Sequence, residues 1–438
     1  MVMNYGHYVF FNNGKNIMKF KKISIIGLGY VGLPLAYNLS KYFNVVGFDI
    51  NKKRIKELNI YKDSNLDLTK IELKKNNFLK TFNLEDLKNS DIFIITVPTP
   101  INKNKKPDIQ PLKEACQIVG KFISKKNLVI FESTVYPGLT EELCKPILEK
   151  ISGLKSPRDF GIGYSPERVN PGDKKHTLIK ISKIVSGQNK KICDIVFYIY
   201  KKIIKAKIFK ASSIKIAESA KVIENIQRDL NIAFVNELSI IFNNLNLKTR
   251  EIINLASTKW NFMKFEPGLV GGHCISVDPY YLTYKSTLSG YKPKFILSGR
   301  SINDQMPEYI VKILLNKIKK KNIKKINFFG ITFKENCPDF RNSLSIRLIQ
   351  KLKKKFRVDV HDPYHESKNL INGIKINSFE KIKKRDVNII SVNHKFYKKN
   401  KSYFIKKIFK KNCLILDLKG IFNEHEILKY KLKNIWQL

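Results

Sequence analysis

Short apolar runs rich in β-branched residues alternate with amphipathic stretches along the first half of the chain. The runs that predict strands are residues 22–26, 45–48, 92–97, 128–131, 161–164 and 184–186. Helical stretches such as residues 33–42 lie between most of these runs. Strands that alternate with helices predict an open parallel sheet covered by helices.

The second half changes its pattern twice. From residue 213 to about residue 245, apolar residues recur at mixed intervals of three and four, which predicts one long helix or a bent pair between two domains. A further helix is predicted over residues 308–320, and the last boundary follows it. Strands are then predicted at residues 326–329, 358–361, 387–392 and 414–417, with a helix at residues 344–354.

These patterns predict an α/β protein with two Rossmann-like domains joined by a long central helix. The expected division of the chain is a disordered extension over residues 1–18, a first domain over 19–210, a central helical domain over 211–321, and a second α/β domain over 322–438.

The composition excludes several classes of protein. No apolar run reaches ~18 residues, so the sequence predicts no membrane span. The six cysteines include no CxxC pair, which argues against a zinc site or a disulfide framework and suits a reducing cytoplasm. His361 and His365 lie four apart, but no further ligands cluster around them, so we predict no metal site.

The formal net charge of +45 allows two interpretations. One is a nucleic-acid-binding protein. The other is a biased composition, because lysine is spread over the whole chain beside abundant isoleucine and asparagine, as A+T-rich codons would produce. The lysines form no single stripe interleaved with aromatic residues, so we favour the second interpretation and expect no nucleic-acid partner.

Residues 27–32 form a GxGxxG turn between the first predicted strand and its helix, and Asp49 ends the second strand. This is the fingerprint of a dinucleotide site, in which the glycines let a pyrophosphate approach the helix N-terminus. Asp49 would accept hydrogen bonds from the adenosine ribose, which favours NAD over NADP. Lys52, Lys53 and Arg54 leave NADP open, because they could hold a 2′-phosphate; Arg54 could instead lie over the adenine.

Thr99, Thr134 and Glu167 each follow a different predicted strand of the first sheet. Ligands of such sheets bind at the carboxyl ends of the strands, so Thr99 and Thr134 are candidate cofactor contacts. Glu167 could be a solvated loop residue. Its position suits at least equally a general base or a residue that positions water.

The long helical stretch carries Lys221 and Asn225, which lie one turn apart on one face. Solvent exposure would explain both residues. In an otherwise apolar helix, the pair also suits a site that stabilises an oxyanion. The remaining charged residues of this stretch are expected to be ordinary polar positions: Glu218, Glu224, Arg228 and Asp229.

Cys274 lies on a loop, directly after Gly271-Gly272-His273 and four residues before Asp278. Adjacent glycines let backbone approach a ligand closely. A thiolate is a strong nucleophile, and a nearby cation can lower its pKa. A lone cysteine is more often a small buried hydrophobe, so the rest of the chain must support a catalytic role.

The second α/β domain has a polar loop over residues 332–343 after its first strand. The loop lacks a GxGxxG turn, so a second dinucleotide is not expected. Lys334 and Arg341 could contact a phosphate or a bound cofactor.

Taken in order, these motifs resemble those of the nucleotide-sugar 6-dehydrogenases, the UDP-glucose dehydrogenase superfamily. The resemblance covers roughly residues 20–435 and is carried by residues 27–32, 97–100, 132–138, 164–168, 217–225, 271–278 and 333–343. Residues 224–231, 258–262 and 268–274 look most like UDP-N-acetylhexosamine dehydrogenases of the Vi-antigen and O-antigen type, which act on UDP-GlcNAc or UDP-GalNAc. Pro171 stands where UDP-glucose dehydrogenases carry a second glutamate, which counts against UDP-glucose as the substrate.

The resemblance implies a role for each matching residue. Cys274 matches the nucleophile, Lys221 and Asn225 the groups that stabilise the oxyanion, and Asp278 an acid that activates water or the thiol. Glu167 matches the glutamate of thioester hydrolysis, and Thr134 a threonine beside it. The implied cofactor contacts are Gly27, Gly29, Tyr30, Val31, Gly32, Asp49, Arg54, Thr99, Thr134 and Arg341. The implied substrate contacts are Glu167, Arg168, Lys221, Asn225, Gly271, Phe333 and Lys334.

The implied reaction is an NAD-dependent four-electron oxidation of the sugar C6 alcohol, for surface polysaccharide biosynthesis. A cysteine is needed because an aldehyde loses a hydride readily only after a nucleophile has added to it. The first domain would bind NAD, the second the UDP-sugar, and the central helix would form at least a homodimer. The alternatives are UDP-ManNAc or UDP-glucose as the substrate, a two-electron hydroxyacid dehydrogenase of the 6-phosphogluconate type, and a basic nucleic-acid-binding protein.

Overall fold

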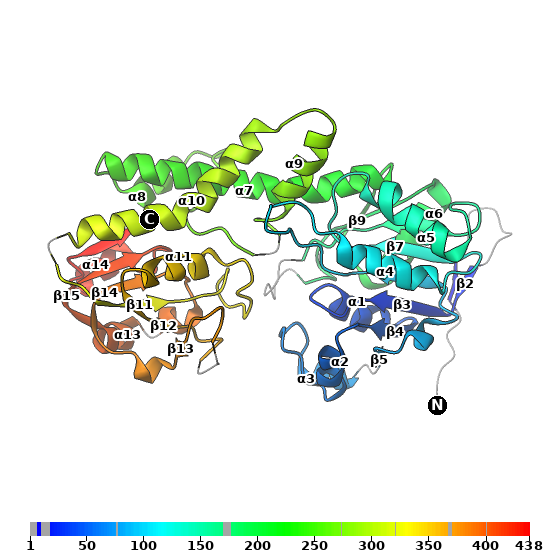
Figure 1. Cartoon of the computed structure of the whole chain (residues 1–438), viewed down its shortest axis with the longest axis horizontal. Helices are drawn as coiled ribbons and strands as arrows, with labels where there is room; N and C mark the ends of the chain where they lie inside the picture. Colours follow the sequence, from blue (N-terminus) through cyan, green and yellow to red (C-terminus); the bar gives the residue numbers. More distant parts are fainter. Residues whose placement is uncertain are drawn as a thin grey trace. The chain divides into compact units, whose positions relative to one another are not determined.

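The structure is a computed structural model that describes residues 7–9, 18–75, 78–169, 177–272, 274–319, 321–366, 370–399 and 401–438 (Figure 1). Contacts divide the chain into two compact units, Met1–Glu224 with Tyr280–Tyr291, and Asn225–Pro279 with Lys292–Leu438. The three-domain division drawn from the sequence stays a prediction. Of the expected extension, the structure describes β1 (His7–Val9) and Met18, the first residue of β2 (Met18–Phe20), which pairs antiparallel with β1. The rest of residues 1–18 lies outside the described residues.

The first unit contains an eight-stranded sheet with the order β10-β9-β8-β7-β6-β3-β4-β5. Its strands are β3 (Lys22–Ile26), β4 (Asn44–Phe48), β5 (Leu79–Thr81), β6 (Ile92–Ile95), β7 (Leu128–Phe131), β8 (Gly161–Tyr164), β9 (Lys183–Gly187) and β10 (Ile208–Lys210). The helices are α1 (Gly32–Leu39), α2 (Lys52–Asn59), α3 (Lys70–Lys75), α4 (Gln110–Gly120), α5 (Lys145–Ser152) and α6 (Lys190–Ile203). Every residue of β6 and β7 is buried, as expected of central strands covered on both faces.

The prediction of a purely parallel first sheet is wrong at one edge. β9 pairs antiparallel with β8, although β10 again runs parallel to β9. A parallel return needs a long crossover, usually a helix. The described part of the connection from β8 to β9, residues 165–169 and 177–182, contains no helix.

One helix, α7 (Ile214–Asn244), runs through the stretch for which the sequence left a bent pair open. It is continuous over 31 residues. The helices that follow are α8 (Thr249–Ala256), α9 (Asp278–Leu288) and α10 (Lys294–Lys317). The described part of the chain has no helix that is long and apolar enough to cross a membrane.

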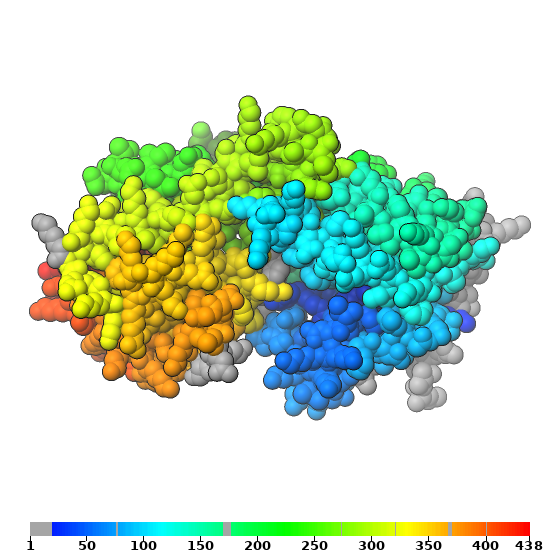
Figure 2. Space-filling model, in the orientation of Figure 1, coloured from blue at the N-terminus to red at the C-terminus, as the bar shows by residue number. Residues whose placement is uncertain are grey.

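The second unit contains a six-stranded parallel sheet with the order β13-β12-β11-β14-β15-β16. Its strands are β11 (Lys325–Phe329), β12 (Arg357–His361), β13 (Ile376–Asn377), β14 (Arg385–Ile390), β15 (Phe409–Asp417) and β16 (Ile435–Gln437). The helices are α11 (Leu344–Lys353), α12 (Lys395–Lys399), α13 (Lys401–Ile408) and α14 (Glu424–Lys429). α10 packs beside α11, and both reach the surface of this unit (Figure 2). The predicted Rossmann-like fold is therefore present twice.

Candidate active site

The glycine-rich turn between β3 and α1 leaves room for a ligand on one side only. A Cβ at Gly32 would overlap the carbonyl oxygen of Gly27 and the hydroxyl group of Thr96, so only glycine fits there. A Cβ at Gly29 would meet nothing within 4 Å, so a pyrophosphate can approach the backbone at this point. Gly27 has φ +100°, which favours glycine. Tyr30 and Val31 complete the predicted turn.

Asp49 closes β4 next to this turn. One carboxylate oxygen accepts a hydrogen bond from the backbone N–H of Leu28 at 2.8 Å, and the other from that of Asn51 at 2.8 Å. The side chain is held in one orientation and remains partly exposed, as a group that receives ribose hydroxyls must be. The turn and Asp49 together fit a dinucleotide.

Arg54 lies at the same turn but is committed to protein partners. Its guanidinium group forms an ion pair with Asp63 at 2.8 Å and donates to the carbonyl oxygen of Leu28 at 3.0 Å. The residue is only 9% exposed. Because Asp63 neutralises this cation, Arg54 is poorly placed to hold a 2′-phosphate, which favours NAD over NADP.

Thr99 and Thr134 lie together at the carboxyl ends of β6 and β7. The Thr99 hydroxyl group donates to the carbonyl oxygen of Thr134 at 2.7 Å. The turn after β7 is held by Glu218 of α7, whose carboxylate accepts hydrogen bonds from the backbone N–H groups of Gly138 (2.5 Å) and Thr140 (3.1 Å). Burial raises the pKa of Glu218 to about 7, against the effect of these donors.

The prediction that the charged residues of α7 are ordinary polar positions is wrong for three of the four. Glu218 and Asp229 are fully buried. Glu224 forms an ion pair with Arg168 at 2.7 Å, and Arg168 also donates to the carbonyl oxygen of Ser182 at 2.8 Å. A helical periodicity marks apolar faces but cannot show that another element covers the polar face, so the sequence carried no signal for these contacts.

Glu167 lies just after β8, in a cluster that the sequence did not predict. Its carboxylate accepts hydrogen bonds from the backbone N–H groups of Arg168 (2.8 Å) and Val169 (2.5 Å). It also forms an ion pair with Lys183 of β9 at 3.3 Å. Lys183 also pairs with Glu132, which follows β7, at 2.8 Å. Two carboxylates therefore share one buried ammonium group.

Lys221 and Asn225 are both 5% exposed, so the alternative of a solvent-facing pair does not hold. The Asn225 side-chain amide donates to the carboxylate of Asp278 at 2.5 Å. Asp278 is itself buried and begins α9. Its backbone N–H bonds to the carbonyl oxygen of Cys274 at 2.9 Å, so Asn225, Asp278 and the cysteine loop form one connected group in the second unit.

The cysteine loop packs against the loop after β11. Gly272 has φ +96°, and a Cβ there would lie 2.8 Å from the ring of Phe333. A Cβ at Gly271 would lie 2.6 Å from the carbonyl oxygen of Asn342. The two glycines are therefore required by this packing, and two predicted motifs, residues 271–278 and 333–343, are brought together within one unit.

Two cations that the sequence analysis missed flank the same loop. The Lys419 side chain lies against Gly268, and the Arg250 guanidinium group lies against Gly420 and pairs with Glu266 at 3.0 Å. Burial lowers the pKa of Lys419. The sequence contains 82 lysine and arginine residues, and the residues next to Arg250 and Lys419 give no signal that distinguishes these two from the rest. Glu266 offsets part of this charge, so an anionic substrate group would meet a partly compensated pair of cations here.

Of the other predicted contacts in this unit, Arg341 is turned toward its own loop. Its guanidinium group donates two hydrogen bonds of 2.9 Å to Asp339 and is half exposed. Lys334 is partly exposed, and the Thr332 hydroxyl group donates to its carbonyl oxygen at 2.8 Å. The position of Pro171 lies outside the described residues. Among the described residues, no three histidine, cysteine, aspartate or glutamate side chains are grouped as a metal site would require.

Buried polar side chains fix the start of the cysteine loop. The side chain of Asn236 on α7 both donates to the carbonyl oxygen of Gly268 (3.0 Å) and accepts from its N–H (2.8 Å). Asn236 also donates to Asn303 of α10 at 2.8 Å. Asn303 in turn donates to Asp229, which pairs with the fully buried Arg300 at 2.5 Å. The loop is therefore anchored to two long helices.

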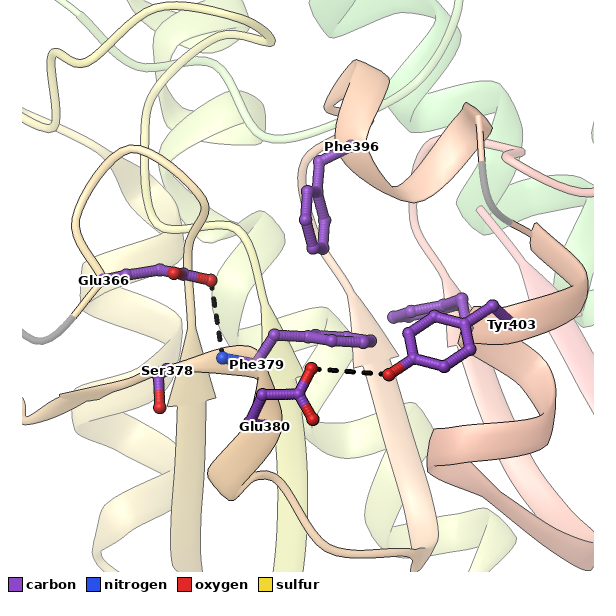
Figure 3. Close-up of a pocket in the computed structure, with 7 residues that line it drawn as sticks. Glu366, Ser378, Phe379, Glu380, Phe396 and Tyr403 are labelled. Carbon is purple, nitrogen blue, oxygen red and sulfur yellow. Dashed lines mark hydrogen bonds between the residues drawn. The ribbon is translucent and has the colours of Figure 1, made fainter.

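A separate pocket of about 280 Å³ lies in the second unit, after the ends of β12 and β13 (Figure 3). It is lined by Glu366, Ser378, Phe379, Glu380, Phe396, Tyr403 and Phe404. The rings pack against one another, with 5.2 Å between the centroids of Phe379 and Phe396, and Glu380 is paired with Lys407 at 2.5 Å. None of its lining residues is among the site residues predicted from the sequence.

Sequence models of one family match three consecutive parts of the chain. They are the NAD binding domain (residues 21–204), the central domain (215–305) and the UDP binding domain (327–424) of the UDP-glucose/GDP-mannose dehydrogenase family. The chain belongs to this family, which confirms the resemblance carried by its motifs. It is therefore an NAD-dependent nucleotide-sugar 6-dehydrogenase, with a UDP-sugar as its substrate.

Two named relatives and one solved structure are similar to the chain over more than 90% of its length. The chain is 48% identical to the UDP-N-acetyl-D-glucosamine 6-dehydrogenase of Pseudomonas aeruginosa over 93% of this chain and 98% of the relative. It is 49% identical to the enzyme of the same name from Salmonella typhi, over 91% and 96%. Among solved structures, UDP-D-ManNAc dehydrogenase from Pyrococcus horikoshii matches with a TM-score of 0.82 and 31% identity, over 92% and 96% of the two chains.

Proposed function

We propose that this enzyme oxidises C6 of a UDP-N-acetylhexosamine, UDP-GlcNAc or UDP-GalNAc, to the uronic acid through a covalent intermediate on Cys274. The observation that carries this proposal is the 48–49% identity, over more than 90% of both chains, to enzymes named for UDP-N-acetyl-D-glucosamine. Relatives named for UDP-N-acetyl-D-mannosamine, such as that of Methanocaldococcus jannaschii, are 35% identical. UDP-ManNAc is therefore the second candidate substrate.

The proposed chemistry has two oxidations and one hydrolysis. When bound, NAD⁺ accepts one hydride in each oxidation. The first removes a hydride from C6 and a proton from its hydroxyl group, which leaves an aldehyde. The Cys274 thiolate adds to this carbon, and Lys221 and Asn225 stabilise the resulting alkoxide. Loss of the second hydride leaves a thioester, and water attacks it to release the carboxylate and the thiolate.

The buried carboxylates have distinct roles in this scheme. Asp278 orients the Asn225 amide through their 2.5 Å hydrogen bond and lies one turn from the thiol. Glu167 positions the hydrolytic water, with Thr134 beside the cofactor. The cations Arg250 and Lys419, together with Lys334, bind the diphosphate and keep the sugar nucleotide against the cysteine loop. Phe333 packs on Gly272 and shapes the substrate side of that loop.

α7 supports the proposal of a homodimer. Ile216, Ile223, Phe234 and Ile241 follow one another at intervals of 7, 11 and 7 residues, which places them on one side of the helix. Each is between 45% and 54% exposed. Exposed apolar residues on one side of a helix are typical of an interface, and a second copy of α7 would cover them. We also propose that the product is used in surface polysaccharide biosynthesis and that the enzyme acts in the cytoplasm.

The test is the yield of NADH per sugar when UDP-GlcNAc, UDP-GalNAc, UDP-ManNAc and UDP-glucose are offered separately. We expect two NADH per molecule of UDP-GlcNAc or UDP-GalNAc. Cys274→Ser should bind NAD normally and form no acid, whereas Cys413→Ser, at a buried strand position, should keep turnover. One NADH per sugar, or normal acid formation by Cys274→Ser, would exclude the proposed mechanism. Turnover of UDP-glucose alone would exclude the proposed substrate.

A further inference from the structure

Three ionisable side chains, those of Lys183, Glu132 and Glu167, form a cluster in the first unit. The side chains of Lys183 and Glu132 are 2% and 0% exposed, and that of Glu167 is 11% exposed. The Tyr200 hydroxyl group of α6 donates to the second oxygen of Glu132. One buried cation therefore faces two carboxylates, of which only Glu167 reaches the surface of the cluster.

We propose that Lys183 is a positioning residue for the hydrolysis step, which holds the Glu167 carboxylate ionised and in one orientation; this inference rests on the proposed function. Two backbone N–H groups occupy one oxygen of Glu167, and the ammonium group contacts the other at 3.3 Å. Rotation of the carboxylate would break all three contacts. The remaining lone pairs of the second oxygen are the ones available to a water molecule.

Glu132 and Tyr200 hold the ammonium group in place. Glu132 approaches it at 2.8 Å, and the Tyr200 ring centroid lies 5.0 Å from the same nitrogen. A lysine without a carboxylate partner would not stay charged in a buried site, and Glu167 remains such a partner when Glu132 is replaced. Burial alone would lower the pKa of Lys183, but the two carboxylates outweigh it, and the pKa lies above its ordinary value.

The two carboxylates respond to burial in opposite ways. Burial raises the pKa of Glu132 to about 7, despite Lys183 and Tyr200. Burial would also raise the pKa of Glu167, but Lys183 and the backbone donors outweigh it, so this pKa lies below its ordinary value. As pH falls, the enclosed carboxylate of Glu132 therefore takes up a proton before the more accessible carboxylate of Glu167 does. The other charged groups near this turn, Arg168 and Glu224, are paired with each other.

The experiment compares variants that disturb the same buried cluster but differ in whether Glu167 keeps its cation. Lys183→Met removes the cation. Glu132→Gln removes the competing carboxylate and leaves the cation on Glu167. The double variant Glu132→Gln/Lys183→Met removes both charges, so Glu132 is not left as an unpaired, fully buried carboxylate, and the test survives if Lys183→Met does not fold. Lys150→Met, at an exposed position of α5, is the control for loss of a lysine.

The readout is the decay of the acyl-enzyme as a function of pH. Enzyme is mixed with UDP-GlcNAc and NAD⁺, quenched at intervals, and the Cys274 adduct is quantified by intact-protein mass. Loss of the cation should raise the pKa of Glu167 by about 1–3 units. Lys183→Met and the double variant should therefore accumulate the adduct and lose hydrolysis rate as pH falls from 7 to 5. Glu132→Gln, Lys150→Met and wild type should show no such decline, and KM for UDP-GlcNAc should stay within about twofold.

The outcomes separate this inference from the proposed function. A wild-type pH dependence in Lys183→Met and the double variant overturns the positioning role. The same decline in Glu132→Gln also overturns it, because the cluster would then act only through packing. In both cases, two NADH per sugar and a Cys274 adduct in wild type leave the proposed function intact. If wild type itself forms no adduct, the proposed function fails and the inference falls with it.

Discussion

Each unit of the protein buries a cation between two carboxylates, and the two clusters serve different purposes. In the second unit, the cation is Arg300, which pairs with Asp229 of α7 and with Asp304 one turn along its own helix. Only long helices are involved, and Asn303 and Asn236 extend the contacts to the cysteine loop. Arginine cannot lose its proton, so this cluster is a fixed clamp.

In the first unit, the cation is Lys183, and its partners Glu132 and Glu167 follow two strands at the carboxyl edge of the sheet. Glu132, with a pKa of about 7, can gain or lose a proton near neutral pH, whereas Lys183 keeps its charge because the two carboxylates raise its pKa. The same ionic arrangement therefore stabilises a scaffold where it lies between helices, and it can serve chemistry where it lies at the carboxyl end of a strand. Four predictions test this difference, from the largest effect to the smallest.

Arg300→Met should lower the free energy of unfolding by about 3–5 kcal/mol, because it leaves a buried aspartate without its charge partner. Urea unfolding measures the change. Arg347→Met, at a half-exposed pair with Glu308, is the matched control and should cost at most about 1 kcal/mol. Equal losses in the two variants would contradict the assignment of Arg300 as a clamp.

Lys183→Met should cost about 3 kcal/mol at pH 8 and less at pH 6. The buried Glu132 can take up a proton once its cation is gone, and protonation is easier at lower pH. The cost of Arg300→Met should change less over this range, because Asn303 still donates to Asp229. Unfolding of both variants at the two pH values tests the contrast, and a pH-independent cost for Lys183→Met would be evidence against it.

Glu132 should make stability fall with rising pH. Its pKa is about 7 in the folded protein and 4.5 ordinarily, so between these values the folded state binds more protons than the unfolded state. The contribution is fully present below about pH 4.5 and is lost as pH rises through about 7, with a slope of at most about 1.4 kcal/mol per pH unit. The difference in unfolding free energy between wild type and Glu132→Gln should show this slope; a flat difference would refute it.

Asn236→Ala should cost about 1–3 kcal/mol, because it leaves the N–H and carbonyl groups of Gly268 without their buried partner. The loosened cysteine loop should lower kcat with UDP-GlcNAc while the affinity for NAD, measured by calorimetry, stays unchanged. Asn244→Ala, at an exposed end of the same helix, should change neither quantity. A reduced NAD affinity in Asn236→Ala would contradict this prediction, because the effect would then not be limited to the cysteine loop.

Much of the fold was predictable because its signals are local. The strands of both sheets are short apolar runs, and the glycine turn, Asp49 and the long helix follow from spacing alone. The antiparallel entry of β9 was missed, since strand direction depends on the connection and not on the strand's own residues. The short strands β5, β10, β13 and β16 were also missed, because two or three residues carry too little pattern.

For the site, the sequence determined which residue types stand at which spacing: the cysteine between glycines, the Lys221–Asn225 pair, and the glutamate after a strand. The partners around these residues come from the packing of elements that lie far apart in the sequence. This packing paired Glu167 with Lys183, Asn225 with Asp278, and Arg300 with Asp229 across separations of 16, 53 and 71 residues. Such pairings depend on which elements pack together, and burial then decides which charges persist. In a chain with 82 lysine and arginine residues, nothing local distinguishes the few buried cations from the many solvated ones.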